Sequence, residues 1–285
     1  MAFFSFGTPA QRFAKKFNRL RDTVHDASGT FSGSRMLARL AALQPLAEAV
    51  GADSDEMADL LWLQFVVFRK RQQDTEGLPL GLRALAMRAA KGKLTPTERY
   101  EQHYAIGESA LEAKEYDTAI EHLQQSVHWA AHEGVTLSVE RKLGMREEIG
   151  YALHEAGRFG EALAHNRQLL TDAQAAFGFG TDRRMSGVIN NLAQNAHQLG
   201  KHAEAKTWMQ QRLALGKALD DTDIVLDALF QLGLLAHETR RTAEARAFFQ
   251  QRVDIARAKD DDYLLESARA TLAEFEERKP QGKPR

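Results

Sequence analysis

An internal repeat runs through much of this chain and limits the folds that it can adopt. Four pairs of small or apolar residues recur midway along amphipathic helical stretches, at Ile106-Gly107, Ile149-Gly150, Leu192-Ala193 and Leu232-Gly233. A second helical stretch follows each pair and carries one alanine of the series Ala119, Ala162, Ala205 and Ala245. Both series advance by 43, 43 and 40 residues. A period of this length is typical of solenoid arrays, so the chain is predicted to fold as stacked units.

Short polar turns separate the two helical stretches of each unit. These turns are Lys114–Tyr116, Gly157–Phe159, Gly200–His202 and Arg240–Thr242. Glycine opens two of them, and it adopts the left-handed conformation that ends a helix without steric cost. Each unit is therefore predicted to be a helix, a tight turn and a helix. Stacking such hairpins predicts an all-α, right-handed α-solenoid whose first helices line a concave face.

The composition agrees with an all-α chain and excludes several functions. Six prolines in 285 residues favour helices over turn-rich β structure, and the absence of cysteine excludes disulfides, cysteine-ligated zinc and thiol nucleophiles. A net charge of −1 argues against a chain-wide nucleic-acid surface. The longest strongly apolar stretch, Leu60 to Phe68, is too short to cross a membrane, and the first residues lack a secretory signal. A cytoplasmic location is therefore predicted.

Residues 1–95 carry no clear copy of the repeat and are predicted to form a helical N-terminal module. Their 14 basic and 9 acidic residues contrast with 24 and 30 in the remainder. Apolar spacing predicts two early helices, around Phe13 to Val24 and around Met36 to Leu46, and then a degenerate pair, Asp55 to Arg71 and Leu78 to Lys91, joined by a turn at Asp74–Gly77. Residues 96–278 are predicted to be the repeat array, with a C-terminal capping helix from Asp261, and residues 279–285 a disordered tail.

Two charged segments have a structural and a functional interpretation. The stretch Gln11 to Arg21 is basic on one side and aromatic on the other, which is compatible with a membrane surface or a partner groove. A buried helix with solvated cations is the favoured interpretation. The acidic clusters Asp220–Asp223 and Asp260–Asp262 lie between units, where they are predicted to cap helices and not to bind calcium.

Three segments of the third unit resemble the tetratricopeptide repeats, in particular the long-repeat variety of kinesin light chains. They are Asn190-Asn191-Leu192-Ala193, Gly200-Lys201-His202-Ala203-Glu204-Ala205 and Gln211-Arg212-Leu213-Ala214-Leu215. The chain departs from the family pattern at His202, where an aromatic residue is usual, and at Arg240 and Thr242 in the last unit. The resemblance covers roughly residues 99–259 and implies a non-enzymatic protein that holds a peptide or partner segment in its concave groove. An adaptor, a chaperone and a peptide-responsive regulator all fit.

The resemblance also implies which side chains face that groove. Carried over by register, they are Glu101, Tyr104, Glu108, Glu112, Glu147, Tyr151, His154, Glu155, Asn190, Gln194, His197, Gln198, Phe230 and His237. Amide side chains such as Asn190 and Gln194 can donate to and accept from a peptide backbone. This row contains no Lys or Arg, which disfavours the clamp for acidic C-termini that some repeat proteins carry. A neutral-to-basic peptide or protein partner is therefore predicted.

The competing interpretations are a metal-dependent enzyme or sensor and a self-associating scaffold. Glycine-rich phosphate loops, nucleophile elbows and complete zincin motifs are all missing, so no catalytic residue, cofactor or metal is predicted. His122, His128 and His132 are a possible metal group. His154, His197 and His237 recur at one place in three units, but neighbouring helices about 8 to 10 Å apart suit zinc poorly, and peptide contacts or a pH response fit better. Homo-oligomerisation stays open.

Overall fold

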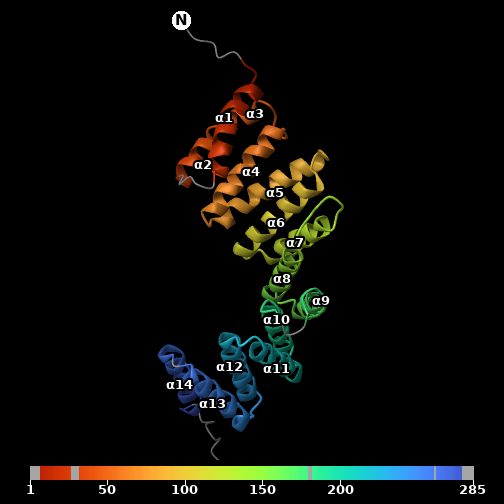
Figure 1. The fold of residues 1–285 in the computed structure, drawn as a ribbon. Helices are drawn as coiled ribbons and strands as arrows, with labels where there is room; N and C mark the ends of the chain where they lie inside the picture. Colours follow the sequence, from red (N-terminus) through yellow and green to blue (C-terminus); the bar gives the residue numbers. More distant parts are fainter. Residues whose placement is uncertain (1–6, 27–31, 179–181, 260, 278–285) are drawn as a thin grey trace, which may run out of the picture. The chain divides into compact units, whose positions relative to one another are not determined.

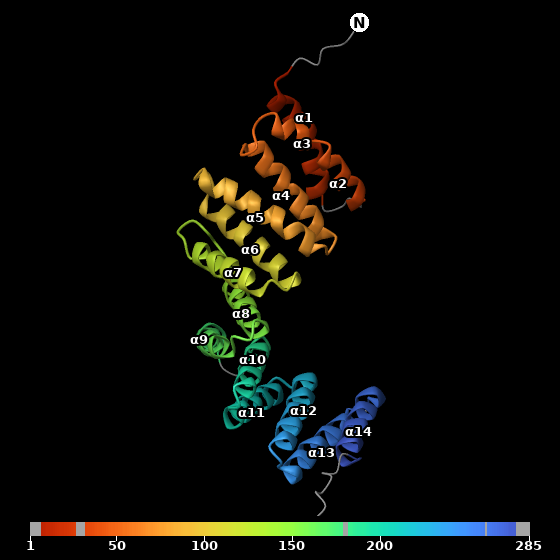
Figure 2. The same ribbon diagram turned by 180° about the vertical axis from the view of Figure 1, so that it is seen from behind.

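A computed structural model describes residues 7–26, 32–178, 182–259 and 261–277. Within these ranges the chain forms fourteen α-helices and no β-strand (Figures 1 and 2). The chain divides into two compact units, Met1–Ala152 and Leu153–Arg285, called unit 1 and unit 2 below. No helix of the described residues is long and apolar enough to cross a membrane.

Unit 1 joins an N-terminal helical module to helix hairpins. Its helices are α1 (Pro9–His25), α2 (Gly33–Ala41), α3 (Gln44–Glu48), α4 (Asp55–Lys70), α5 (Asp74–Ala90), α6 (Pro96–Glu112), α7 (Tyr116–Ala130) and all but the last residues of α8 (Val139–Glu155). Helices α1, α2 and α3 pack on α4, while α4 pairs with α5, α5 contacts α6 and α6 pairs with α7 (Figure 1). Phe13, Phe17 and Val24 of α1 are buried in the core of this module, so the favoured interpretation of α1 as a buried helix is confirmed.

Two of the helix boundaries predicted for unit 1 were wrong. The helix expected around Met36 to Leu46 is divided into α2 and α3, because Ala42 and Leu43 form a turn between them. The turn between α4 and α5 lies at residues 71–73, and the predicted turn at Asp74–Gly77 is instead the first turn of α5. Gln72 adopts a left-handed φ of 56°, and the N–H of Gln73 donates to Phe68, so the chain reverses before Asp74.

Unit 2 is a row of helices in which each packs on the next. They are α9 (Phe159–Phe177), α10 (Met185–Gln198), α11 (His202–Ala218), α12 (Thr222–Glu238), α13 (Thr242–Ala258) and α14 (Asp262–Glu277). The predicted capping helix is α14, whose Ala268 is buried with Val253 and Ala256 of α13. The side chain of Asp221 accepts from the Ile224 N–H at 3.1 Å, and that of Asp261 accepts from the Leu264 N–H at 3.0 Å, so both act as the predicted caps. Asp260 and the predicted tail 279–285 lie outside the described residues.

The turns inside the four repeat hairpins share one backbone geometry. The left-handed residues are Lys114, Gly157, Gly200 and Arg240, with φ of 61°, 73°, 70° and 59°. In each turn the next N–H donates to the carbonyl five residues back, as in Glu115 to Ala110 at 2.8 Å and Arg241 to Ala236 at 2.8 Å. This is the 6→1 bond of the Schellman motif. The left-handed turn predicted for the two hairpins with glycine therefore forms there, and it also forms in the two hairpins without glycine.

Small residues at the helix crossings allow the close packing that the repeat predicted. A Cβ on Gly107 would lie 2.7 Å from Leu123 Cγ, and one on Gly233 would lie 2.4 Å from Phe249 Cε1. The second-helix residues at this crossing follow the repeat spacing and are Leu123, Asn166, Met209 and Phe249. Asn166 is the polar exception: it is 0% exposed, and neither atom of its amide has a hydrogen-bond partner in the described structure.

Candidate functional site

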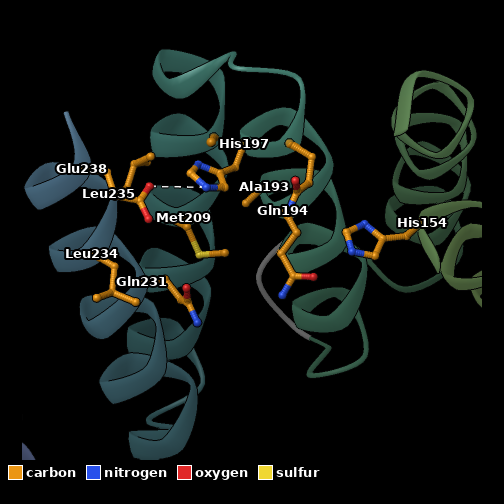
Figure 3. Close-up of a pocket in the computed structure, with 11 residues that line it drawn as sticks. His154, Ala193, Gln194, His197, Met209, Gln231, Leu234, Leu235 and Glu238 are labelled. Carbon is orange, nitrogen blue, oxygen red and sulfur yellow. Dashed lines mark ion pairs between the residues drawn. The ribbon is translucent and has the colours of Figure 1, made fainter. Parts of the chain in front are cut away.

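A pocket of about 130 Å³ lies along the first helices of unit 2 (Figure 3). Helices α10 and α12 carry most of its lining, α11 contributes Met209 and Ala205, and the end of α8 contributes His154. The packing that forms it follows from the repeat, because Ala193 of α10 is buried against Met209 and Leu232. The pocket therefore lies on the row of first helices that the repeat predicts to face the groove.

Three amide side chains line this pocket without a partner of their own. Gln194 and Gln198 come from α10 and Gln231 from α12, and no side-chain hydrogen bond to any of them is present in the described residues. Figure 3 shows the amides of Gln194 and Gln231 in the space between the two helices. Leu234, 36% exposed, and Leu235 add an apolar wall. An amide offers both a donor and an acceptor, so the pocket presents unused hydrogen-bonding groups beside apolar surface.

The three recurring histidines each contact the first helix of the following repeat. The Asn195 amide nitrogen donates to the Asn191 carbonyl, so its oxygen, 2.9 Å from His154 Nδ1, accepts from that ring. His197 Nε2 lies 3.3 Å from the carboxylate of Glu238 (Figure 3). The rings of His237 and Phe275 meet edge-on, with centroids 5.2 Å apart.

His197 has a second feature that bears on binding. Its Nδ1 is buried and has no hydrogen-bond partner in the described part of the chain. A buried polar atom of this kind favours a ligand or water that supplies the missing bond. His197 lines the pocket together with His154, and each of the two also contacts the first helix of the following repeat.

The structure separates the predicted groove residues of unit 2 into two sets. His154, Gln194, His197 and Gln198 line the pocket together. The others lie apart from its lining: Asn190 is half-buried on α10, Glu155 is exposed at the end of α8, and the half-buried Phe230 and His237 contact neighbouring rings. Phe230 also lies 5.3 Å from the Arg252 guanidinium, so it serves helix packing.

The predicted row of unit 1 is more polar and more internally bonded. Tyr104 is 6% exposed, its hydroxyl donates to Glu148 at 2.6 Å, and burial raises its pKa. Arg141 lies over the Tyr104 ring at 4.0 Å. Glu108 pairs with Arg69 at 2.9 Å.

The remaining members of that row differ in their exposure. Burial raises the pKa of half-buried Glu147 above its ordinary value. Tyr151 is 47% exposed, and Glu101 and Glu112 are exposed. Burial also raises the pKa of Glu148, although the hydrogen bond from Tyr104 opposes this shift. Acidic residues are therefore present in this row, but Glu108 is already paired with Arg69, and Tyr104 is already bonded to Glu148, which lies outside the predicted row.

Several residues of these sites were not predicted from the sequence. Leu234 and Glu238 stand 40 residues after Gln194 and Gln198, so the last repeat interval would have found both. Gln231 likewise stands 40 residues after Asn191. Glu148 offered no such signal, because its role depends on the position of the Tyr104 hydroxyl.

The possible metal group of His122, His128 and His132 does not assemble. His122 of α7 instead meets His103 of α6, with the two Nδ1 atoms 3.1 Å apart. Burial and the neighbouring charge of His122 lower the pKa of His103 to about 4, and burial also lowers that of His122. His128 and His132 are exposed. Among the described residues, no group of three or more His, Cys, Asp or Glu side chains is placed to hold a metal ion.

Comparisons with known proteins identify the repeats. Residues 184–258 match the family model of the tetratricopeptide repeat. The apo form of RapI is similar at 12% identity over 94% of this chain and 71% of that chain, with a TM-score of 0.62. Kinesin light chain TPR-like repeats from Podosopora anserina match at 16% identity over 74% of this chain and 98% of that chain, with a TM-score of 0.52. The apo quorum sensor NprR from B. thuringiensis matches at 16% identity over 92% and 68%, with a TM-score of 0.51. A search of proteins with curated descriptions finds no match.

Hairpins that recur every 40 to 43 residues, with small residues at their crossings, define an all-α solenoid of helix-turn-helix repeats. Residues 184–258 carry the tetratricopeptide repeat, and the kinesin light chain repeats share the fold. The fold class predicted from the sequence is therefore confirmed, and the predicted resemblance to tetratricopeptide repeats is confirmed for residues 184–258.

Proposed function

We propose that the protein is a binding module, not an enzyme, and that the pocket of unit 2 holds an extended peptide or partner segment. The observation that carries this proposal is the set of three unpartnered amides, Gln194, Gln198 and Gln231, that line one pocket beside the exposed Leu234. Amides of this kind recognise a peptide backbone, and an apolar wall accepts one of its side chains. Among proteins of this fold, NprR is a quorum sensor.

The charge of the pocket supports a neutral or basic ligand. Its lining contains one carboxylate, Glu238, and no lysine or arginine. The Glu238 carboxylate already contacts His197 Nε2, so a cationic group of the ligand competes with this histidine for the carboxylate. We further propose a cytoplasmic location, because the chain has no cysteine and therefore none of the disulfides that are typical of proteins from oxidising compartments. A fluorescent fusion tests this location.

The test is a peptide-library selection with the full chain, followed by affinity measurement on the selected peptides. Gln194→Ala combined with Gln231→Ala removes two backbone contacts, each worth about 1 kcal/mol, so affinity should fall about 30-fold. The matched control replaces Gln210 and Gln251 by alanine, because both are exposed on second helices and neither lines the pocket.

Two results would refute the proposal. Selected peptides that bind the pocket variant as tightly as the wild type would place recognition elsewhere, and failure to select any peptide would remove its basis. Light scattering of the same samples over a concentration series tests the alternative of self-association, which the sequence leaves open.

A further inference from the structure

A second concave surface lies on the N-terminal module, far along the sequence from the pocket of unit 2. It is a cleft of about 910 Å³ bordered by α1, α2 and the start of α3. Its lining includes five cationic side chains, Arg12, Lys15, Lys16, Arg19 and Arg39, and no carboxylate. This charge imbalance sets the cleft apart from the near-neutral chain as a whole.

These cations have no partner within the described structure. Neither an ion pair nor a side-chain hydrogen bond to any of the five is present, although other cations of unit 1 are paired, such as Arg88 with Asp59 at 2.7 Å and Arg69 with Glu108 at 2.9 Å. Like charges that are gathered without counter-charge repel one another and favour an anionic ligand. The cleft therefore presents a charge pattern that an acidic partner complements.

The spacing of the cations suits a helical partner. Arg12, Lys16 and Arg19 stand at positions i, i+4 and i+7 of α1 and so share one face over about 10 Å. A partner helix that carries carboxylates at i, i+4 and i+7 therefore repeats its negative charges at the same interval as the positive charges of α1. Leu20 and Leu46, both half-buried, give the cleft an apolar part beside the charges.

The burial of α1 argues against a membrane as the occupant. Phe13 and Phe17, the aromatic side of this helix, are 2% and 6% exposed and stack on each other in the core with ring centroids 5.0 Å apart. A helix that lies in a membrane interface exposes its aromatic face to lipid. The cations also come from two helices that border a concave surface, since Arg39 belongs to α2.

We propose that this cleft binds an acidic, amphipathic helix of a partner protein. The carboxylates of that helix pair with the cations of α1 and α2, and its apolar residues contact Leu20 and Leu46. The cleft shares no lining residue with the pocket in unit 2, so the protein has two surfaces for two partners of different charge.

The test is fluorescence anisotropy of the full chain with a labelled peptide of about 18 residues, which carries Glu at i, i+4 and i+7 and Leu beside them. Lys16→Glu combined with Arg19→Glu should weaken binding at least about tenfold. The matched control, Arg21→Glu with Arg35→Glu, makes the same change in net charge on α1 and α2 outside the cleft lining and should change affinity less than about twofold. Circular dichroism verifies that both variants fold.

Three outcomes would overturn the assignment. The first is absence of peptide binding by the wild type, and the second is an equal loss of affinity in the cleft variant and the control. The third is tighter binding of phosphatidylserine vesicles or of a DNA duplex of about 20 base pairs, lost in the cleft variant, which would identify another class of partner.

Discussion

Replacing Asn166 by leucine should stabilise unit 2 by about 2 kcal/mol. Asn166 is fully buried and both atoms of its amide lack partners, whereas the equivalent residues Leu123, Met209 and Phe249 are apolar and buried. A buried amide without hydrogen bonds costs about 1 to 3 kcal/mol. Leucine has the same branching of heavy atoms as asparagine, and Leu123 occupies the equivalent crossing beside Gly107, so the substitution removes this cost with a side chain that this crossing holds in another repeat.

The assay is urea unfolding followed by circular dichroism, in which Asn166→Leu should raise the unfolding midpoint. The reciprocal substitution Leu123→Asn places an amide in an apolar crossing beneath Gly107 and should destabilise the protein by about 3 kcal/mol. An unchanged or lower midpoint for Asn166→Leu would refute the reasoning, because it would mean that the amide makes bonds worth more than its burial costs.

Two further predictions concern backbone strain and acid. Arg240→Gly should stabilise the last hairpin by about 0.5 to 1 kcal/mol in thermal unfolding, because φ is 59° there, while Gly200→Ala at φ 70° should lose a similar amount; equal effects of the two would contradict this. The pKa of His103 is about 4 in the folded state and about 6.5 in the unfolded state, so the unfolded state binds a proton on this ring more strongly than the folded state does. Stability is therefore fully present above about pH 6.5 and should fall by about 1 to 2 kcal/mol as the pH drops toward 4, a decrease that His103→Gln should reduce in urea unfolding at pH 7 and pH 4.5; an unaltered pH dependence would count against it.

The repeat was predictable because packing imposes a strong requirement at a few positions. Gly107 and Gly233 are small since a second helix crosses directly over them, and such residues recur visibly in the sequence. The capping roles of Asp221 and Asp261 were also predictable, because an N-cap depends on residues only three positions away.

Contacts between helices without a fixed spacing were not predictable. His103 and His122 meet because two residues of one hairpin face each other, and Glu148 is engaged because the Tyr104 hydroxyl reaches it. Neither contact follows the 43-residue period. The location of the predicted domain boundary at residues 95 and 96 and the use of the groove by a ligand stay predictions.

The packing of each helix of unit 2 on the next has a mechanical consequence. Helices α9 to α14 form a series in which neighbours in sequence are also neighbours in space. When a pulling force on the C-terminus unfolds α13 and α14, the packing of α9, α10 and α11 on one another therefore stays in place. Each released hairpin of about 40 residues adds about 130 to 140 Å of extended chain. We therefore expect unit 2 to unfold in steps of one hairpin, so that its extension under force reports how many hairpins remain folded.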